Sequence, residues 1–494
     1  MSRLTRNFAA NFGASIAAAL VALLVIPLYV RRLGMEPYGL IAFSIALRAA
    51  LQVLDLGLAP VVNREVARYV ADRESSSDAQ DVLYTFQGLY WCVAVLVGAV
   101  IVTFAPSIAK DWLDAKSLSV ESVTLSVRLI GILIATQWPI AFYQSALLGL
   151  ERQVSLNGIL TAALFVTHAC ALSLMVWWPR VEIFFLVAIA VGVIQVTALA
   201  WIFWTSMPPE VRTFRLTALR HVARFTLGVG AISVTGVILS HMDKMIVSVV
   251  LPLERFAHYS MATMIAGALV LITTPVFNTV YPRFSALAAA SENDAVRELH
   301  HFSTQLVTVA VVPAALTIIF FSRELVEIWT GSAATAALVA PLAMFLVAGA
   351  ALNGVMTVPY ALQLSHAWIR PALIFGVAAT LAYLPLVPFL ALKFGAEGAA
   401  LSWLLMNATY FAVMAPIIHR HLLPGSFPEW LGRDVLLPSG CAAAVVAVCA
   451  AALPRAESAF GKLAMIAGTY AIAALIAMTA AGRIRNWVMR RIGS

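Results

Sequence analysis

Charged residues are scarce in this chain of 494 residues. Asp, Glu, Lys and Arg together make up 11% of it, whereas hydrophobic residues make up 62%. A water-soluble protein carries roughly 25% charged residues on average. The sequence therefore excludes a string of soluble domains, and we expect the lipid bilayer to be the main solvent of the fold.

Cysteine is scarce as well, with four residues that all lie inside apolar stretches. Their spacing lacks the close pairs that build zinc sites and the framework of a small disulfide-bonded protein. We therefore interpret these cysteines as packing residues and predict no metal site. The residues concerned are Cys92, Cys170, Cys441 and Cys449.

The sequence also lacks a nucleotide-binding loop and any long polar loop. Gly461-Lys462 has no upstream glycine of the phosphate-binding motif, so we expect no ATP hydrolysis. The longest expected connections span only about 20 residues each. A membrane enzyme, such as a polysaccharide polymerase or a glycosyltransferase, commonly places its catalytic groups on a long outer loop. We therefore predict a protein that is not an enzyme and needs no cofactor, with the enzyme as the less favoured alternative.

Apolar runs fill the sequence instead, each long enough to cross a hydrocarbon core of about 30 Å as a helix. They are continuous and show no strand-like alternation, which favours helices over a β-barrel. We predict an all-α polytopic membrane protein with about fourteen transmembrane helices. The predicted ranges are 8–30, 38–60, 82–105, 122–148, 155–177, 182–204, 223–250, 256–280, 301–321, 335–362, 369–391, 397–418, 436–453 and 460–481.

Basic residues in the connecting loops predict the orientation. Cytoplasmic loops of membrane proteins are enriched in Lys and Arg, and most of the 32 Lys and Arg fall on one side if both termini are cytoplasmic. These charges flank membrane helices and do not form a soluble basic module, so we expect no nucleic-acid partner. The first apolar run is expected to be retained in the membrane. The main contributors to the bias are Arg212, Arg215, Arg220, Arg224, Arg483, Arg485, Arg490 and Arg491.

An internal repeat appears at a shift of 215 residues. Six crossings return the chain to its starting side, so two six-helix halves would run in the same direction around a central cleft. We predict a first bundle at 1–207, a second bundle at 208–421, and two additional helices with a cytoplasmic tail at 422–494. The pairs that carry the repeat are Gly13 with Gly228, Pro60 with Pro275, Asn63 with Asn278, and Arg68 with Arg283.

Several short motifs along the chain have a recognisable pattern. They are Asn11-Phe12-Gly13, Ile26-Pro27-Leu28-Tyr29-Val30-Arg31-Arg32-Leu33-Gly34, Tyr38-Gly39, Asp55-Leu56-Gly57-Leu58, Asn63-Arg64-Glu65, Asp243-Lys244-Met245-Ile246-Val247-Ser248 and Tyr281-Pro282-Arg283-Phe284-Ser285. With these motifs the chain resembles the bacterial polysaccharide flippases of the Wzx type. The similarity covers nearly the whole chain, although the loop at 252–260 lacks the glycines that the family often has there.

This resemblance implies a MATE-like fold, shared by multidrug and oligosaccharidyl-lipid exporters. It implies a bacterial plasma-membrane flippase that moves polyprenyl-pyrophosphate-linked oligosaccharide from the inner to the outer leaflet by alternating access. The product would serve O-antigen or exopolysaccharide biosynthesis, with membrane lipids and a polysaccharide polymerase machinery as further partners. Which saccharide is carried is not specified by these motifs.

Polar residues within the second apolar run give the clearest candidate site. Arg48, Gln52 and Asp55 are spaced to share one helical face near the middle of the membrane. A charge at this depth costs a few kcal/mol or more unless it is paired or hydrated. We favour a wet cleft in which Arg48 binds an anionic head group. The alternative is an Arg48–Asp55 ion pair that holds helices together.

Further candidates lie in other helices. Lys244, Ser248 and His241 share one face of the seventh predicted helix, and Arg128 lies in the fourth. Lys244 and Arg128 could equally extend to the outer surface. Asn407, in the twelfth, suits sugar hydroxyls but also suits a bridge between helices.

The energy source is left open by the sequence. Coupling to H+ or Na+ would fall on Asp55, Asp243 or His241, and consumption of the product outside the cell is the alternative. An ion-coupled multidrug exporter is the rival transporter. Its cleft should be acidic, whereas Arg48, Arg128 and Lys244 outnumber the two intramembrane aspartates.

Overall fold

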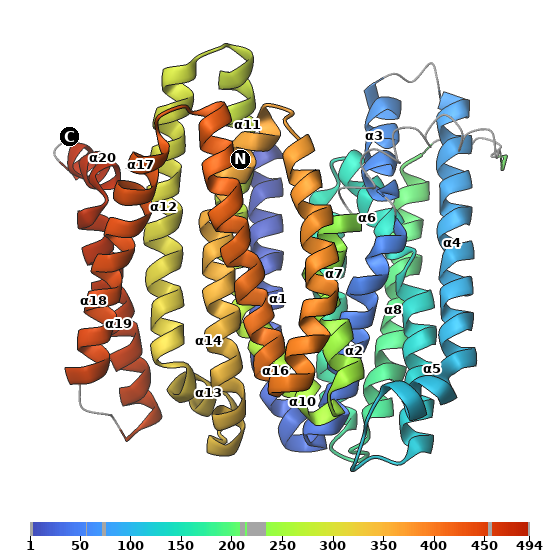
Figure 1. Cartoon of the computed structure of the whole chain (residues 1–494). Coiled ribbons are helices and arrows are strands. Elements are labelled where there is room, and N and C mark those ends of the chain that lie inside the picture. The colour runs from blue at the N-terminus through green and yellow to red at the C-terminus, as the bar shows by residue number, and fades with distance from the viewer. Residues whose placement is uncertain are drawn as a thin grey trace. The chain divides into compact units, whose positions relative to one another are not determined.

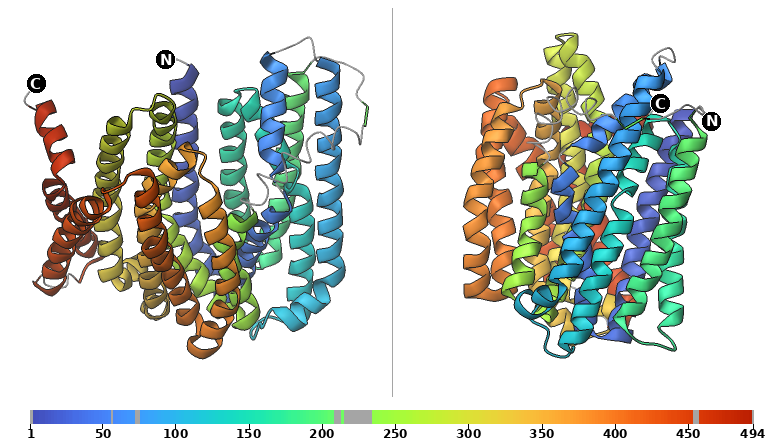
Figure 2. Two further views of the ribbon diagram at one scale, coloured as in Figure 1. Left: turned by 45° about the horizontal axis from the view of Figure 1, so that its top comes forward. Right: turned by 90° about the vertical axis from the view of Figure 1, so that its right-hand side faces the viewer.

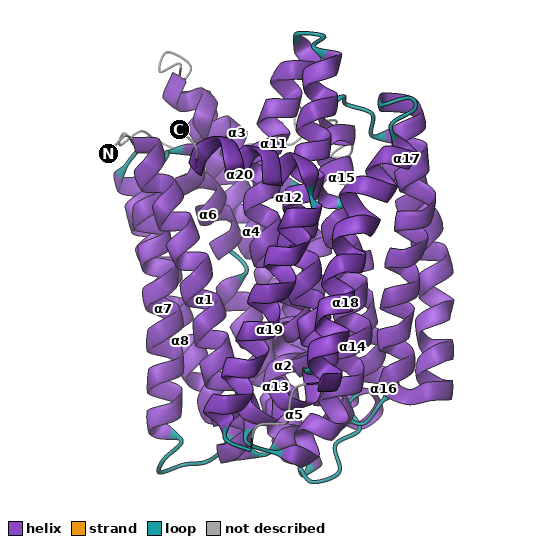
Figure 3. Ribbon diagram, turned by 90° about the vertical axis from the view of Figure 1, so that its left-hand side faces the viewer, coloured by secondary structure: helices purple, strands orange, loops and turns teal. Residues whose placement is uncertain are grey.

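The computed structural model describes residues 3–55, 57–71, 76–207, 213–214, 234–452 and 457–492. Over these ranges the chain forms helices joined by short loops, and no strand occurs among them (Figure 3). This outcome follows from composition, because a backbone in lipid must satisfy its N–H and C=O groups within its own segment. The prediction of an all-helical polytopic membrane protein is confirmed for the described residues.

The chain divides into two compact units, Met1–Ala257 and His258–Ser494. The first unit also includes a helix at 234–250 and the start of α10 (Leu253–Gly267). Its other elements are α1 (Arg3–Leu33), α2 (Met35–Leu51), the 3-10 turn η1 (Gln52–Asp55), α3 (Leu58–Ala71), α4 (Ser76–Ser107), the π-helical turn η3 (Ile108–Trp112), α5 (Val120–Gln137), α6 (Ile140–Gly149), α7 (Gln153–Leu174) and α8 (Val181–Thr205) (Figure 1).

The second unit contains the rest of α10 and the elements that follow it. The helix at 234–250, which belongs to the predicted second bundle, is not part of this unit. The elements are α11 (Val270–Ala289), α12 (Asn293–Phe320), α13 (Ser322–Thr330), α14 (Ala333–Val355), α15 (Thr357–Ser365), α16 (Arg370–Leu422), α17 (Phe427–Glu429), the π-helical turn η4 (Trp430–Leu436), α18 (Leu437–Ala452), α19 (Ala459–Ala480) and α20 (Gly482–Ile492).

Eleven helices among the described residues are long and apolar enough to cross a membrane, or twelve if the bent pair α10–α11 counts as one span. The 53 residues of α16 would extend about 80 Å if straight, far more than a hydrocarbon core. Instead α16 turns back at Gly395 (φ 65°, ψ −147°), as Figures 1 and 2 show. Its two arms match the predicted helices 369–391 and 397–418. The predicted helix 223–250 falls partly outside the described residues, so the total of fourteen stays a prediction.

The prediction of one continuous helix over 38–60 is wrong. The α-helix ends at Leu51, η1 follows, and α3 starts after Gly57, whose φ of 79° lies in the left-handed region. Pro60 in the first turn of α3 has no N–H to continue the earlier helix. Similar breaks interrupt three other predicted helices, namely 122–148 between α5 and α6, 256–280 between α10 and α11, and 335–362 between α14 and α15.

The order of elements recurs in the two units, which supports the internal repeat. In the first unit the broken pair α2–α3 precedes the long helix α4 and the broken pair α5–α6. In the second, the broken pair α10–α11 precedes the long helix α12 and the broken pair α14–α15. Pro60 and Pro275 fall in the corresponding helices α3 and α11. Gly228, the partner of Gly13, lies outside the described residues. The division of the chain into bundles at residues 207 and 421 stays a prediction.

Candidate functional site

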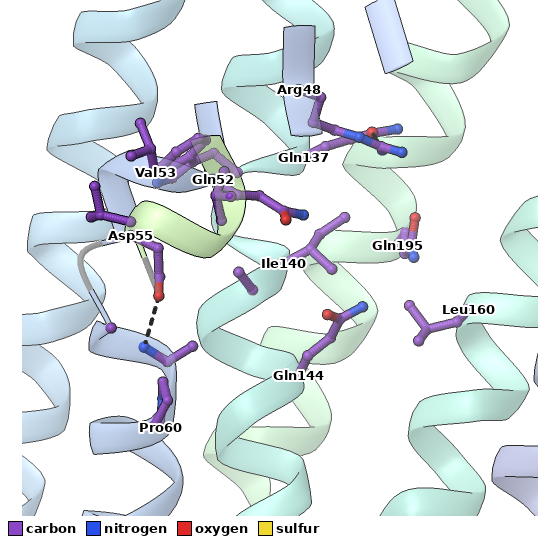
Figure 4. A pocket seen from close by; sticks show the side chains of 16 residues that line it. Arg48, Gln52, Val53, Asp55, Pro60, Gln137, Ile140, Gln144, Leu160 and Gln195 are labelled. Atoms are coloured by element: carbon purple, nitrogen blue, oxygen red, sulfur yellow. Dashed lines mark hydrogen bonds between the residues drawn. The ribbon is translucent and has the colours of Figure 1, made fainter. Parts of the chain in front are cut away.

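A cavity of about 550 Å³ opens inside the first unit. Its walls come from α2, η1, α3, α5, α6, α7, α8 and the helix at 234–250. Its polar lining consists of the side chains of Arg48, Gln52, Asp55, Gln137, Gln144 and Gln195, which surround one space in Figure 4. The three residues singled out in the second predicted helix therefore do meet at one site, although they do not share a continuous α-helix.

Two of the helix breaks position this lining. The break between α2 and α3 carries Gln52 and Asp55, and the break between α5 and α6 lies between Gln137 and Gln144. Irregular backbone at membrane depth is tolerated only where it is buried in protein or lines a water-filled cavity. The breaks are thus placed where the cavity can solvate the backbone groups that they free.

Arg48 is exposed to this cavity, and its Nη1 donates a hydrogen bond to Oε1 of Gln137. Across the described ranges no carboxylate forms an ion pair with Arg48. The alternative of an Arg48–Asp55 pair is therefore absent from the structure. A guanidinium supported only by a neutral amide keeps four of its five N–H donors for water or an anion.

Asp55 has different partners. Its Oδ1 accepts a hydrogen bond from the Tyr90 hydroxyl, and its Oδ2 accepts one from the Ala59 backbone N–H at 3.2 Å. The second bond satisfies one of the four N–H groups that a helix leaves free at its start, here that of α3. Asp55 therefore joins α4 to the broken α2–α3 segment, and both of its oxygens are engaged.

The comparisons with known proteins agree with this architecture. Residues 4–288 match the family model described as "Polysaccharide biosynthesis protein". The chain belongs to this polysaccharide biosynthesis protein family. A Shigella flexneri protein described as "Putative O-antigen transporter" is 20% identical over 381 residues, which are 76% of this chain and 87% of that protein.

Two solved structures show the fold to which this member of the polysaccharide biosynthesis family belongs. The lipid II flippase MurJ in an inward closed conformation gives a TM-score of 0.70 at 12% identity, covering 94% of this chain and 97% of that one. An inward-facing multidrug resistance MATE family transporter gives 0.65 at 14% identity, covering 84% and 99%. The predicted family and the MATE-like fold are confirmed, and the protein is a multi-pass membrane protein of a transporter fold.

The other candidates of this family member lie outside the cavity. Lys244 pairs with Asp243 at 3.0 Å and donates to the Ser240 carbonyl oxygen at 2.9 Å. The buried hydroxyl of Ser248 accepts from Trp112 Nε1 at 3.0 Å and donates to the Met245 carbonyl oxygen. These residues are thus engaged in contacts within the first unit.

His241, Arg128 and Asn407 are separate from the cavity as well. His241 is half-buried on the helix at 234–250, and Arg128 is exposed on α5. Asn407 is fully buried on α16, where its Oδ1 accepts from Asn353 Nδ2 on α14 at 2.9 Å. This amide bridge between helices is the structural alternative that the sequence left open for Asn407.

Three glutamines of the cavity were not anticipated from the sequence. Gln137, Gln144 and Gln195 come from α5, α6 and α8. The signal that could have found them is an uncharged amide inside an apolar run, since such a group is costly in lipid unless it has a partner or a wet surface.

Among the described residues, no group of His, Cys, Asp and Glu could hold a metal ion.

Proposed function

We propose that this protein flips polyprenyl-pyrophosphate-linked oligosaccharide from the inner to the outer leaflet of a bacterial plasma membrane for cell-surface polysaccharide synthesis. Family membership, the O-antigen transporter relative and the fold shared with the lipid II flippase support the substrate class. The observation that carries the proposal is Arg48, a cation in a membrane cavity without a carboxylate partner among the described residues.

The chemistry of Arg48 suits a pyrophosphate. A charge placed within a membrane segment costs several kcal/mol unless it is hydrated or paired, so an unpaired arginine at such a site suggests a function. Its planar fork of N–H donors matches phosphate oxygens and can bind two of them at once. Gln137 holds the guanidinium through one donor, which leaves the other donors for a ligand.

Alternating access is part of the proposal. Two like-oriented bundles would open in turn to each side of the membrane, with both termini cytoplasmic as the basic loops predict. The breaks between α2 and α3 and between α5 and α6 flank the cavity and offer places where helices can bend. The same proposal includes a polysaccharide polymerase machinery as the recipient of the flipped lipid.

Coupling to H+ or Na+ would be assigned to Asp55, Asp243 and His241. Asp55 is the candidate that lines the cavity. Proton uptake there would weaken its acceptance of the Tyr90 hydrogen bond and of the Ala59 N–H, and would so loosen the break before α3. Asp243 is already paired with Lys244, which makes it a poorer site for a transported cation.

The ion-coupled multidrug exporter is the second candidate, because MATE family transporters share the fold. A site for organic cations needs a net negative charge. In this cavity the positive charge of Arg48 offsets the negative charge of Asp55, the carboxylate among the lining residues, and Asp55 already accepts two hydrogen bonds. The cavity therefore favours an anionic substrate over a cationic drug.

The test compares two substrates in vesicles that contain the purified protein. One is a fluorescent polyprenyl pyrophosphate carrying an oligosaccharide, and the other is a cationic dye. We expect transport of the lipid and not of the dye. Arg48→Ala should reduce lipid transport by about tenfold or more, the effect of losing one or two charge-assisted hydrogen bonds, and Arg48→Lys should restore part of it.

Arg180→Ala is the matched control, since Arg180 is an exposed arginine at the start of α8 and outside the cavity. It should transport like the unmodified protein. Transport of the dye alone would replace the flippase with the exporter. Undiminished lipid transport by Arg48→Ala would remove Arg48 from the site.

A further inference from the structure

Three glutamine side chains in the cavity have no hydrogen-bond partner in the described part of the chain. They are Gln52 on η1, Gln144 on α6 and Gln195 on α8. Figure 4 shows their amide ends around the same space, into which Arg48 and Gln137 also extend. Gln144 and Gln195 are half-buried, and Gln52 is exposed to the cavity.

Elsewhere the same chain uses amides to join its helices. Asn11 on α1 donates to Gln153 on α7 at 2.8 Å, and Asn353 on α14 donates to Asn407 on α16 at 2.9 Å. Such bridges are the ordinary role of amides in membrane proteins, because an unpaired amide in lipid is costly. The three cavity glutamines make no such bridge, which sets them apart from the structural amides.

The shape and polarity of the cavity define the ligand that these amides could bind. Each amide offers two donors and an acceptor without net charge, the complement of hydroxyl and N-acetyl groups. A volume of about 550 Å³ is in the range of small-molecule sites. It can hold a few sugar rings at most, so only the part of a glycan next to the pyrophosphate would enter.

We infer that Gln52, Gln144 and Gln195 form a saccharide-recognition set that selects the sugar attached directly to the pyrophosphate. This inference rests on the proposed function, because Arg48 in the same cavity would hold the pyrophosphate and so bring the first sugar within reach of the amides. Specificity of this kind follows when a site's hydrogen-bonding groups are left unpaired by the wrong ligand. Arg48 would supply affinity for any lipid pyrophosphate, and the glutamines would supply the preference for a sugar.

The experiment measures binding to the full-length protein in nanodiscs. The probes are a short-chain polyprenyl pyrophosphate without sugar and the same lipid carrying a single glucose, galactose, N-acetylglucosamine or N-acetylgalactosamine. We expect at least one glycosylated probe to bind about tenfold more tightly than the bare lipid, as two or three neutral hydrogen bonds would give. The double variant Gln144→Leu/Gln195→Leu should lose this preference and retain its affinity for the bare lipid within about twofold.

Three further variants test the inference and separate it from the proposed function. Arg48→Ala should weaken binding of bare and glycosylated probes by the same factor. Gln87→Leu is the control for an amide outside the cavity, since Gln87 accepts a hydrogen bond from Trp204 at 2.7 Å, and it should keep the sugar preference. Gln144→Asn/Gln195→Asn, which retains shortened amides, should keep part of the preference and guards against misfolding of the leucine variant.

The outcomes are distinguishable. A sugar preference that persists in the leucine variant, or that is absent from the unmodified protein, overturns the inference and leaves the flippase intact. If the leucine variant loses affinity for all probes equally and unfolds at a lower temperature, the glutamines have a structural role, and the inference is overturned as well. If the unmodified protein binds none of the lipid pyrophosphates, the proposed function itself fails.

Discussion

Tyr90 on α4 donates its hydroxyl hydrogen bond to Asp55 at the break between η1 and α3. The tyrosine is 2% exposed, whereas Asp55 is half-buried and lines the cavity. The same carboxylate accepts the Ala59 backbone N–H. The Asp55 side chain thus holds the start of α3 and links the broken α2–α3 segment to α4. The geometry of the cavity wall depends on this carboxylate.

Removing the Tyr90 hydroxyl should destabilise the first unit. In Tyr90→Phe the ring remains, but the half-buried carboxylate of Asp55 loses a donor, which costs about 1 kcal/mol. The measurement is equilibrium unfolding in mixed detergent micelles. Tyr84→Phe, a change of an exposed tyrosine on the same helix, should alter the free energy of unfolding by less than about 0.5 kcal/mol. If the two changes alter the free energy of unfolding equally, the Tyr90–Asp55 hydrogen bond does not stabilise the first unit.

Glu36 is expected to anchor the loop between η3 and α5. Its carboxylate, 5% exposed, accepts the backbone N–H groups of Lys116, Ser117 and Leu118 at 2.6, 2.7 and 3.2 Å, and the Ser117 hydroxyl as well. Glu36→Gln removes the charge and turns one acceptor into a donor that faces other donors. We expect a loss of about 2–4 kcal/mol from bonds to a charged acceptor.

Protease accessibility of the 113–119 loop gives a local measure of this change. The loop should be cleaved faster in Glu36→Gln than in the unmodified protein, because an unanchored loop opens more often. Glu121→Gln, a change of an exposed glutamate two residues beyond the loop, is the control. Unchanged cleavage in Glu36→Gln would mean that the loop is held by other contacts.

Much of the fold could be predicted because the bilayer imposes strict rules on a sequence. Continuous apolar runs must be helices, and the Pro and Asn residues of the repeat fall in corresponding helices of the two units. The breaks within helices were missed. Hydropathy indicates that a segment is apolar and does not locate a break within its helix. Whether a proline bends or ends a helix depends on which neighbours satisfy the freed carbonyl groups.

The candidate site was predicted in part for a similar reason. Arg48, Gln52 and Asp55 stood out because charge and amide groups are costly in lipid. The direction in which a polar residue faces depends on tertiary packing, which one sequence does not reveal. Ser248 and Asn407 have the same polarity pattern as the cavity residues but bond to Trp112 and Asn353.

Close packing of α4 on α5 depends on Gly98. A Cβ added at this glycine would lie 2.7 Å from the Ala135 Cβ and 3.0 Å from the Gly131 carbonyl oxygen. Small residues of this kind let membrane helices approach closely. Gly98→Ala should therefore cost about 1–3 kcal/mol through overpacking. Gly158→Ala on α7 has nothing within 4 Å of the new methyl group and should be neutral or stabilise by up to about 1 kcal/mol. If Gly98→Ala leaves the free energy of unfolding unchanged, α4 can move away from α5 without a loss of stability.

A buried polar network connects the C-terminal helices to α12. Asp434 on η4, which is 0% exposed, bonds to His301 and accepts from Gln305 Nε2 at 2.7 Å, both on α12. Gln305 in turn accepts the Arg483 backbone N–H at 2.9 Å, at the start of α20. The Arg483 guanidinium lies 3.6 Å from Asp434 and 3.1 Å from the exposed Glu298. Asp434 therefore ties three segments together.

Breaking this network should release the C-terminal helices before the rest of the second unit unfolds. Asp434→Ala leaves His301, Gln305 and Arg483 without their shared partner, and removal of one member of a buried charged network costs about 3–5 kcal/mol. Glu298→Ala removes an exposed partner of the same arginine and should cost less than about 1 kcal/mol. Hydrogen exchange of α18 and α19 measures the difference.

The contribution of Arg483 to this network should not depend on pH in the ordinary range. Burial lowers the pKa of Arg483, but the ion pairs with Glu298, Asp434 and Glu429 outweigh burial, and the net pKa is raised above its usual value. A raised pKa means that the stabilisation is fully present below the unfolded pKa and is lost only as pH rises through the folded one, which lies above the already strongly basic pKa of an ordinary arginine. Exchange rates in Arg483→Gln should therefore exceed those of the unmodified protein by the same factor at about pH 7 and about pH 9, after correction for intrinsic exchange. A factor that falls toward one at the higher pH would show that Arg483 loses its charge there, contrary to this assignment.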